Sequence, residues 1–175
     1  WWVRYSQVKQ NDSFTCPAHT TTAGVEKNHC YIGAYLGTST PGSDRRIELR
    51  SVKGVHVGVE KGITVSNIET GRLYAQNRSS AYGIMGVHQY TMLQILYLAA
   101  FKSLDSSRAL GYGNSGSRQK TYAENGELDL AGMISGGRMT PEYGDNRKVK
   151  FLGIEDIYGT RACLLDGAFI NGAGE

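Results

Sequence analysis

Residues 151–170, FLGIEDIYGTRACLLDGAFI, alternate short apolar runs with turn residues. They predict a strand, a turn, a second strand, a tight turn at Asp166-Gly167 and the start of a third strand, because Asp-Gly between apolar runs is a strong hairpin signal. Glu155 and Asp156 stand at the first corner. These acids, with Asp166, could be a catalytic pair, a calcium site or turn residues. We favour turn residues, since the Asp-Gly signal is the most specific of the three.

The composition is that of a single, turn-rich domain. The chain has 175 residues, 40% of them apolar, with 23 glycines, 11 tyrosines and 3 prolines. This length can bury a core without metals or disulfides, so we expect residues 1–175 to form one domain. Many turns and half-buried aromatic residues favour an α+β fold over a helix bundle. Because the chain begins with Trp1-Trp2 instead of Met, we expect it to be a fragment of something longer.

Charge and hydropathy exclude two classes of partner. The net charge of +3 comes from 19 basic and 16 acidic residues, and the one tight basic cluster, 45–50, is interrupted by Glu48. A nucleic-acid footprint needs basic residues concentrated on one face, so we predict no nucleic-acid partner. No run of eighteen apolar residues occurs, so we predict no membrane insertion.

The three cysteines are Cys16, Cys30 and Cys163. Their number is odd and they form no C-x-x-C pair, which argues against both a secreted disulfide framework and a zinc knuckle. A bridge between Cys16 and Cys30 remains open. The four histidines are scattered, with no pair at metal-ligand spacing. We therefore predict no metal, no cofactor and no catalytic residue.

Apolar periodicity locates the secondary structure. Two segments are predicted to be helices. A capping box of Ser66 and Glu69 predicts one over residues 67–79. Apolar residues at spacings of three and four predict the main core helix over 87–104, with an apolar stripe wide enough to dock on a sheet. Alternating apolar and polar residues, or short apolar runs bounded by turns, predict short strands. These strands are expected at 1–5, 30–36, 47–52, 55–59, 63–65 and 148–154.

Residues 105–146 are rich in glycine and polar residues and show little periodicity. Within them, 111–116 match the dinucleotide pattern G-x-G-x-x-G, but a predicted helix precedes the match where a strand is required, so a compact loop is the better interpretation. A long loop on a rigid base suits ligand binding. Tyrosine supplies contact area and asparagine supplies donors and acceptors. The predicted ligand-binding residues are Tyr112, Asn114, Tyr122, Tyr143 and Asn146.

Several motifs together resemble a family. They are YIGAYLG at 31–37, LRSVKGV at 49–55, MLQILYL at 92–98 followed by LGYG at 110–113, and FLGIEDIYG at 151–159 with Asp-Gly at 166–167. In this order they resemble bacteriophage tail and virion proteins of the C-type-lectin fold, over about residues 30–170. The chain departs from that pattern where Leu152 replaces an arginine, where residues 160–162 replace Asn-Ile-Trp, and where it stops after the Asp-Gly turn.

The resemblance implies an α+β, C-type-lectin-like fold of short twisted antiparallel strands, two helices and long loops. It implies a phage tail or tail-fibre protein, located in the virion, that binds a host-surface glycan or protein without catalysis. Other virion subunits are the implied partners, in a homo-oligomer such as a trimer. One alternative is a purely structural virion subunit. The other is an enzyme on a formylglycine-generating or glycan-degrading scaffold, with Glu124, Glu127 and Asp129 as its carboxylates; the active-site cysteine pair of the former is not recognisable here.

Overall fold

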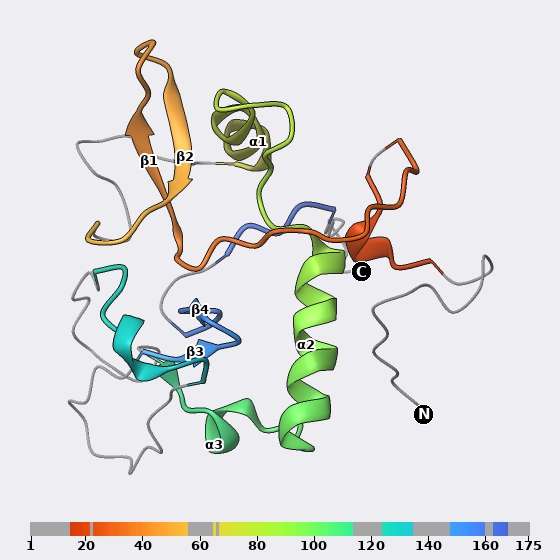
Figure 1. Ribbon diagram of the computed structural model, residues 1–175. Helices are drawn as coiled ribbons and strands as arrows, with labels where there is room; N and C mark the ends of the chain where they lie inside the picture. The colour runs from red at the N-terminus through yellow and green to blue at the C-terminus, as the bar shows by residue number, and fades with distance from the viewer. Residues whose placement is uncertain are drawn as a thin grey trace, which may run out of the picture. The chain divides into compact units, whose positions relative to one another are not determined.

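The computed structural model describes residues 15–21, 23–55, 65, 67–113, 124–134, 148–159 and 163–167. Within them the protein has a mixed α+β architecture with three α-helices and two small antiparallel sheets (Figure 1). Contacts divide the chain into two compact units. The first unit comprises Trp1–Ile32, Met85–Lys102 and Leu165–Glu175, and the second comprises Gly33–Ile84 and Ser103–Leu164.

The first sheet belongs to the second unit and pairs β1 (Gly37–Pro41) with β2 (Ile47–Ser51). The strands are antiparallel, with Gly37 opposite Ser51. The prediction for β2 is confirmed, but the predicted strand at 30–36 is wrong. Those residues, all described, form no strand, and β1 lies in the stretch between the strands predicted at 30–36 and 47–52. Residues 37–41 form a strand because they pair with β2, and Thr38 and Ser39 are buried in this strand.

The second sheet is the hairpin of β3 (Lys150–Phe151) and β4 (Ile154–Glu155). Phe151 pairs with Ile154, which leaves Leu152 and Gly153 as a two-residue turn. Both turn residues have positive φ, 52° and 80°, the signature of a type I′ turn, which matches the twist of a hairpin. A strand, a turn and a second strand were predicted here, but the turn lies at Leu152 and Gly153, inside the strand predicted over 148–154, and not at the corner of Glu155 and Asp156.

The structure around Asp166-Gly167 differs from the predicted hairpin. In the first unit, Asp166 forms an isolated parallel bridge with Gly86, in which Val87 N–H donates to Asp166 O at 2.7 Å. Residues 163–165 are described and form no strand, so the second predicted strand is wrong there. Gly167 has a φ of 79°, as a turn residue would, and the third predicted strand lies outside the described residues.

Leu152 occupies a conformation that disfavours its own side chain. A residue with a Cβ in the left-handed region carries a steric cost that glycine and asparagine largely escape. Leu152→Asn is therefore expected to raise the free energy of unfolding by about 0.5–1 kcal/mol. Urea denaturation would measure this difference. Leu130→Asn is the control, because Leu130 is fully exposed and is not among the positive-φ residues; an equal gain there would contradict the strain argument.

The helix α1 (Ile68–Gln76) packs against β2 in the second unit. The predicted helix is confirmed, but its N-cap is Asn67, whose side chain accepts a hydrogen bond from Thr70 N at 2.8 Å, and it ends before residue 79. Gly71 lies within α1, where a glycine usually destabilises a helix. In the structure a Cβ there would come within 3.3 Å of Ile84 and Val65, so the glycine permits close packing.

The helix α2 (Val87–Phe101) lies in the first unit and ends at Lys102, which adopts a left-handed conformation with φ 51°. It contacts the short helix η1 (Pro17–His19), where Gln89 Nε2 donates to Ala18 O at 2.7 Å. Among its residues, all described, only Leu93 is buried. The sequence predicted one apolar stripe along this helix, and that prediction is wrong in part. Apolar side chains occur on all sides of α2. Two residues of the predicted stripe are exposed: Ala100, and Leu104 beyond the end of the helix.

The remaining helical segments lie in the loop-rich part of the second unit. They are α3 (Ser106–Ala109), capped by the Asp105 side chain on Arg108 N at 2.9 Å, and the short η3 (Asp129–Ala131). The apolar core of this unit is small among the described residues and includes Ala75, Leu110, Val149 and Phe151. No described helix has the length and apolar character needed to cross a bilayer.

Candidate functional site

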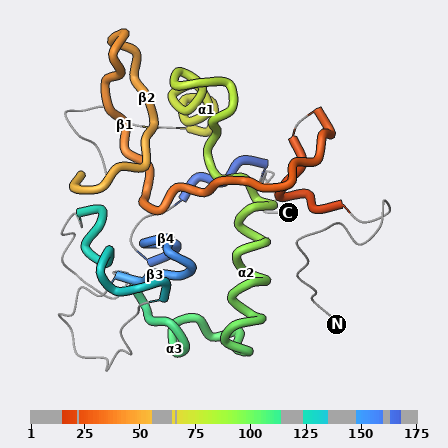
Figure 2. Tube along the Cα trace, viewed as in Figure 1, coloured from red at the N-terminus to blue at the C-terminus, as the bar shows by residue number. Residues whose placement is uncertain are grey.

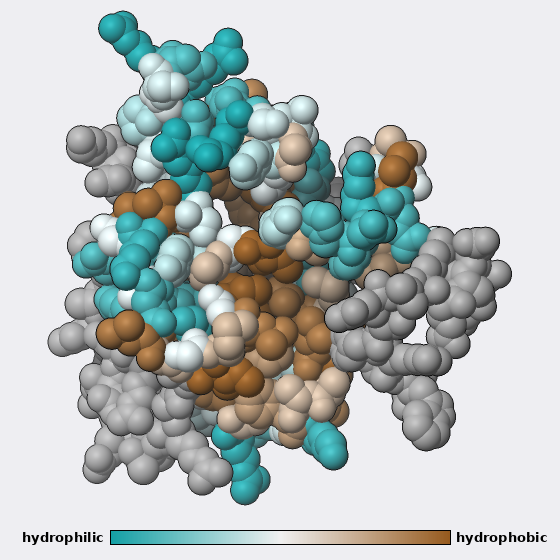
Figure 3. Space-filling view, in the orientation of Figure 1, coloured by the Kyte–Doolittle hydropathy of each residue, from teal (hydrophilic) through white to brown (hydrophobic). Residues whose placement is uncertain are grey.

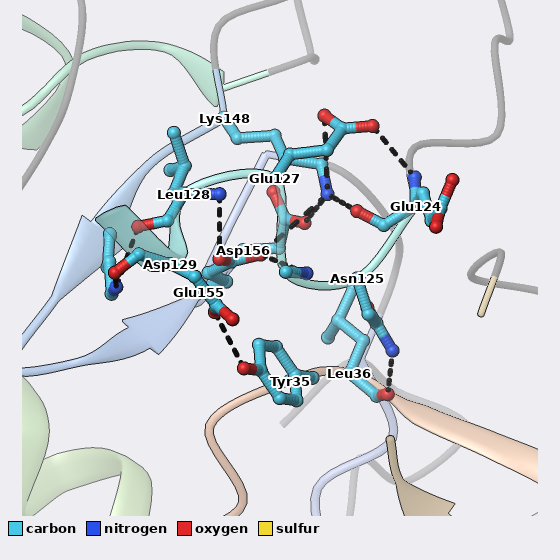
Figure 4. A network of polar contacts seen from close by, with 12 residues as sticks. Tyr35, Leu36, Glu124, Asn125, Glu127, Leu128, Asp129, Lys148, Glu155 and Asp156 are labelled. Carbon is cyan, nitrogen blue, oxygen red and sulfur yellow. Dashed lines mark hydrogen bonds and ion pairs between the residues drawn. The ribbon is translucent and has the colours of Figure 1, made fainter. Parts of the chain in front are cut away.

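A network of charged side chains lies where the loop 124–131 meets the β3–β4 hairpin (Figure 4). Its centre is Lys148, whose side chain is 2% exposed. The Lys148 Nζ lies 3.4 Å from Asp156 Oδ2, 3.6 Å from Glu127 Oε2 and 3.8 Å from Glu155 Oε2, and it donates to the Glu124 carbonyl. We call these residues the Lys148 network. A buried ammonium needs such partners, because an isolated charge is costly away from water.

Glu155 fixes the loop to the hairpin. Its carboxylate accepts hydrogen bonds from Gly126 N and Leu128 N, both at 2.9 Å. From β3, Lys150 Nζ donates to Leu128 O at 2.8 Å. The side chains of Glu155 and Asp156 are 0% exposed. These charge-assisted bonds hold the loop backbone in one conformation.

Asn125 joins the same loop to the first sheet. Its side-chain amide donates to Leu36 O at 3.1 Å and to Val52 O at 2.9 Å, before β1 and after β2. Its backbone pairs with both Gly54 and Val55, at 2.8 and 3.0 Å. Asn125 is 2% exposed. Sequence reasoning missed this residue, because an asparagine followed by glycine looks like an ordinary turn.

The outer edge of the site carries a second set of charges. Tyr35 donates its hydroxyl proton to Asp129 Oδ1 at 2.6 Å, and Lys53 Nζ lies 2.6 Å from Asp129 Oδ2. The hydrogen bonds from Lys53 and then Tyr35 lower the pKa of Asp129. The bond to Asp129 raises the pKa of Tyr35 to about 12 and also raises the pKa of Lys53. Asp129 is therefore an ionised acceptor at neutral pH.

The acids at the first corner have a larger role than the turn predicted from sequence. Asp156 has a positive φ of 55°, and its N–H donates to Val149 O at 2.8 Å, as a corner residue would. Glu155, however, anchors a loop about thirty residues earlier in the sequence. In the described part of the chain, no three His, Cys, Asp or Glu residues are grouped so that they could hold a metal ion.

Among the predicted ligand-binding residues, Tyr112 is described and is 45% exposed. Its loop is held by Tyr158, whose single hydroxyl proton is shared between Gly111 O at 2.7 Å and Ser106 O at 3.1 Å. A Cβ on Gly159 would lie 2.5 Å from Tyr112 O. Asn114, Tyr122, Tyr143 and Asn146 lie outside the described residues.

The second glycine of the G-x-G-x-x-G pattern, Gly113, is a packing residue. A Cβ on Gly113 would meet the Tyr158 carbonyl at 3.0 Å, and its φ is 62°. Two backbone segments therefore approach so closely that only glycine fits. This supports the compact-loop interpretation of the motif.

Comparisons of the chain with protein-family models, curated proteins and solved structures gave no match. The resemblance to C-type-lectin-like phage tail proteins therefore stays a prediction. The function has to be argued from the residues of the site themselves.

Proposed function

We propose that the protein is a phage tail or tail-fibre component with a C-type-lectin-like domain, and that its loops bind a host-surface glycan or protein without catalysis. The observation that carries this proposal is the anchoring of the loops. Glu155 holds residues 124–131 through two backbone amides, and Tyr158 holds the loop that bears Tyr112.

Anchored loops favour affinity because less conformational entropy is lost when a ligand binds. Tyr112 is nearly half exposed on such a loop. A tyrosine ring offers apolar area together with a hydroxyl group, which suits the alternating apolar and polar faces of a sugar. The ligand class that fits best is therefore an uncharged or mildly polar surface glycan.

The carboxylates of the loop support binding over hydrolysis. A glycosidase needs one carboxyl group with a raised pKa as its general acid. Asp129 has the opposite shift, a pKa lowered by Lys53 and Tyr35. Glu127 lies 3.6 Å from Lys148 and accepts a hydrogen bond from Glu124 N at 3.0 Å. Both carboxylates therefore have partners within the protein that suit a structural role.

Tyr112→Ala is expected to weaken binding at least about tenfold, as the loss of an aromatic contact at the centre of an interface does. Binding would be measured on an array of bacterial surface polysaccharides, with intact bacteria as a second probe. Tyr82→Ala is the matched control, because Tyr82 is 50% exposed and lies in the same unit. Equal losses for both variants would contradict the proposed site. Unfolding of Tyr112→Ala, seen by circular dichroism, would make Tyr112 a core residue instead.

A second candidate function is that of a purely structural virion subunit. Apolar residues gather over α2 (Figure 3), and Ile95 and Leu98 are each more than one third exposed. In the second unit Leu130 is fully exposed and Met133 is 62% exposed. Exposed apolar groups of this kind are typical of surfaces that neighbouring subunits cover.

Hydrogen exchange would discriminate the two candidates. A structural subunit should show strong protection of residues 106–113 and 124–131 in the assembled particle compared with the free chain. A receptor-binding protein should leave the loop that bears Tyr112 as exchangeable in the particle as in solution. Protection of that loop in the particle would end the search for a receptor.

A further inference from the structure

Two of the three cysteines lie at the ends of a segment that folds back on itself. Thr20 and Glu26 form an antiparallel bridge, and on either side of it Thr21 N donates to Val25 O and Lys27 N to His19 O, both at 2.9 Å. Figure 2 shows this reversal in the first unit, in red. Cys16 and Cys30 each lie four positions outward from the bridge, one on each arm. The reversal therefore returns the arm that carries Cys30 toward the arm that carries Cys16, the residue just before η1.

Two side chains hold the backbone of Cys16, and one of them comes from the returning arm. The Glu26 carboxylate accepts a hydrogen bond from Cys16 N at 3.0 Å, and the Thr20 hydroxyl donates to Cys16 O at 3.0 Å. Both cysteines are half-buried. Burial and then the charge of Cys16 raise the pKa of the Cys30 thiol. The charge felt by Cys163 is instead that of Asp156.

We propose that Cys16 and Cys30 form a disulfide bond when the protein meets a low-molecular-weight disulfide such as oxidised glutathione. The bond would close residues 16–30 into a loop. That loop contains η1, which contacts α2 through the hydrogen bond from Gln89 to Ala18. The disulfide would thus constrain the contact between η1 and α2. This inference is independent of the proposed ligand-binding function.

The reaction is a two-step thiol–disulfide exchange. One cysteine, as its thiolate, attacks oxidised glutathione, forms a mixed disulfide and releases one glutathione thiolate. The second cysteine loses its proton to solvent and attacks the protein sulfur of that mixed disulfide, which releases the second glutathione. The two cysteines lose two electrons, and the oxidant gains them as two molecules of reduced glutathione.

The full chain would be incubated with oxidised glutathione, its remaining thiols blocked with N-ethylmaleimide, and the protein digested with trypsin. Cleavage after Lys9, Lys27 and Arg45 places Cys16 in peptide 10–27 and Cys30 in peptide 28–45. We expect mass spectrometry to find these two peptides joined, with Cys163 carrying the maleimide or glutathione. The mixed disulfide at Cys16 or Cys30 should stay a minor species beside the joined peptides, because the second thiol acts at a millimolar effective concentration.

Single variants make the result specific. Cys163→Ser should leave the joined peptides unchanged, whereas Cys30→Ser should leave Cys16 as a mixed disulfide with glutathione. The proposal is overturned if Cys16 and Cys30 each end as separate glutathione adducts, if either pairs with Cys163, or if the link appears only between two copies of the chain on a non-reducing gel.

Discussion

Glu155→Ala is expected to lower the free energy of unfolding by about 3–5 kcal/mol. The carboxylate is fully buried, and its removal leaves Gly126 N and Leu128 N without their acceptor. It also removes one of the charges that compensate the buried ammonium of Lys148. Buried polar groups without partners carry the full cost of their lost hydration. Urea denaturation followed by circular dichroism would measure the change.

The control is Glu127→Ala, because Glu127 lies at a similar distance from the same Lys148 Nζ. Its side chain is 51% exposed, so its ion pair is screened by water and we expect a loss of under about 1 kcal/mol. A similar loss for both variants would show that burial does not govern the Lys148 network. Glu155→Gln should be intermediate, because Gly126 N and Leu128 N donate to different oxygens of the carboxylate and glutamine keeps one acceptor oxygen and loses the charge.

Leu93→Ala is expected to cost about 2–5 kcal/mol, because deleting a buried leucine side chain loses its transfer free energy and leaves a cavity. Leu93 is 3% exposed and is the single buried side chain of α2, whose residues are all described. The free energy of unfolding, measured in urea, is the relevant quantity. Unfolding should be monitored by helical circular dichroism, since Leu93 lies in the first unit.

Leu98→Ala is the matched control on the same helix. The substitution is chemically identical and the helix propensities are the same, but Leu98 is 38% exposed. We expect it to cost under about half as much as Leu93→Ala, in proportion to the apolar area it removes from water. Equal costs would indicate that the exposed side of α2 is covered in solution, which would favour the structural-subunit candidate.

The sequence by itself determined the features that depend on neighbouring residues. The apolar run after residue 86 places α2, and the polar residues around Asn67 place the start of α1, because caps and helical periodicity act within one or two turns. The sequence also indicated strands and turns in residues 148–159, although the turn at Leu152 and Gly153 interrupts the strand predicted over 148–154. The α+β class followed from the same local signals.

Only the tertiary structure decided the features that depend on distant residues. The position of β1 depends on its pairing with β2. The packing advantage of a glycine at position 71 depends on the close approach of Ile84. These pairings involve contacts that no local pattern encodes.

The Lys148 network is the clearest case of such dependence. The acid pair at 155–156 reads as a turn, yet Glu155 binds amides of a loop about thirty residues away in sequence, and Lys148 neutralises part of its charge. Burial sets this requirement, because a carboxylate taken out of water needs donors from whichever segment folding brings to it. The local sequence therefore determined where the corner lies, and the tertiary structure determined what its acid holds together.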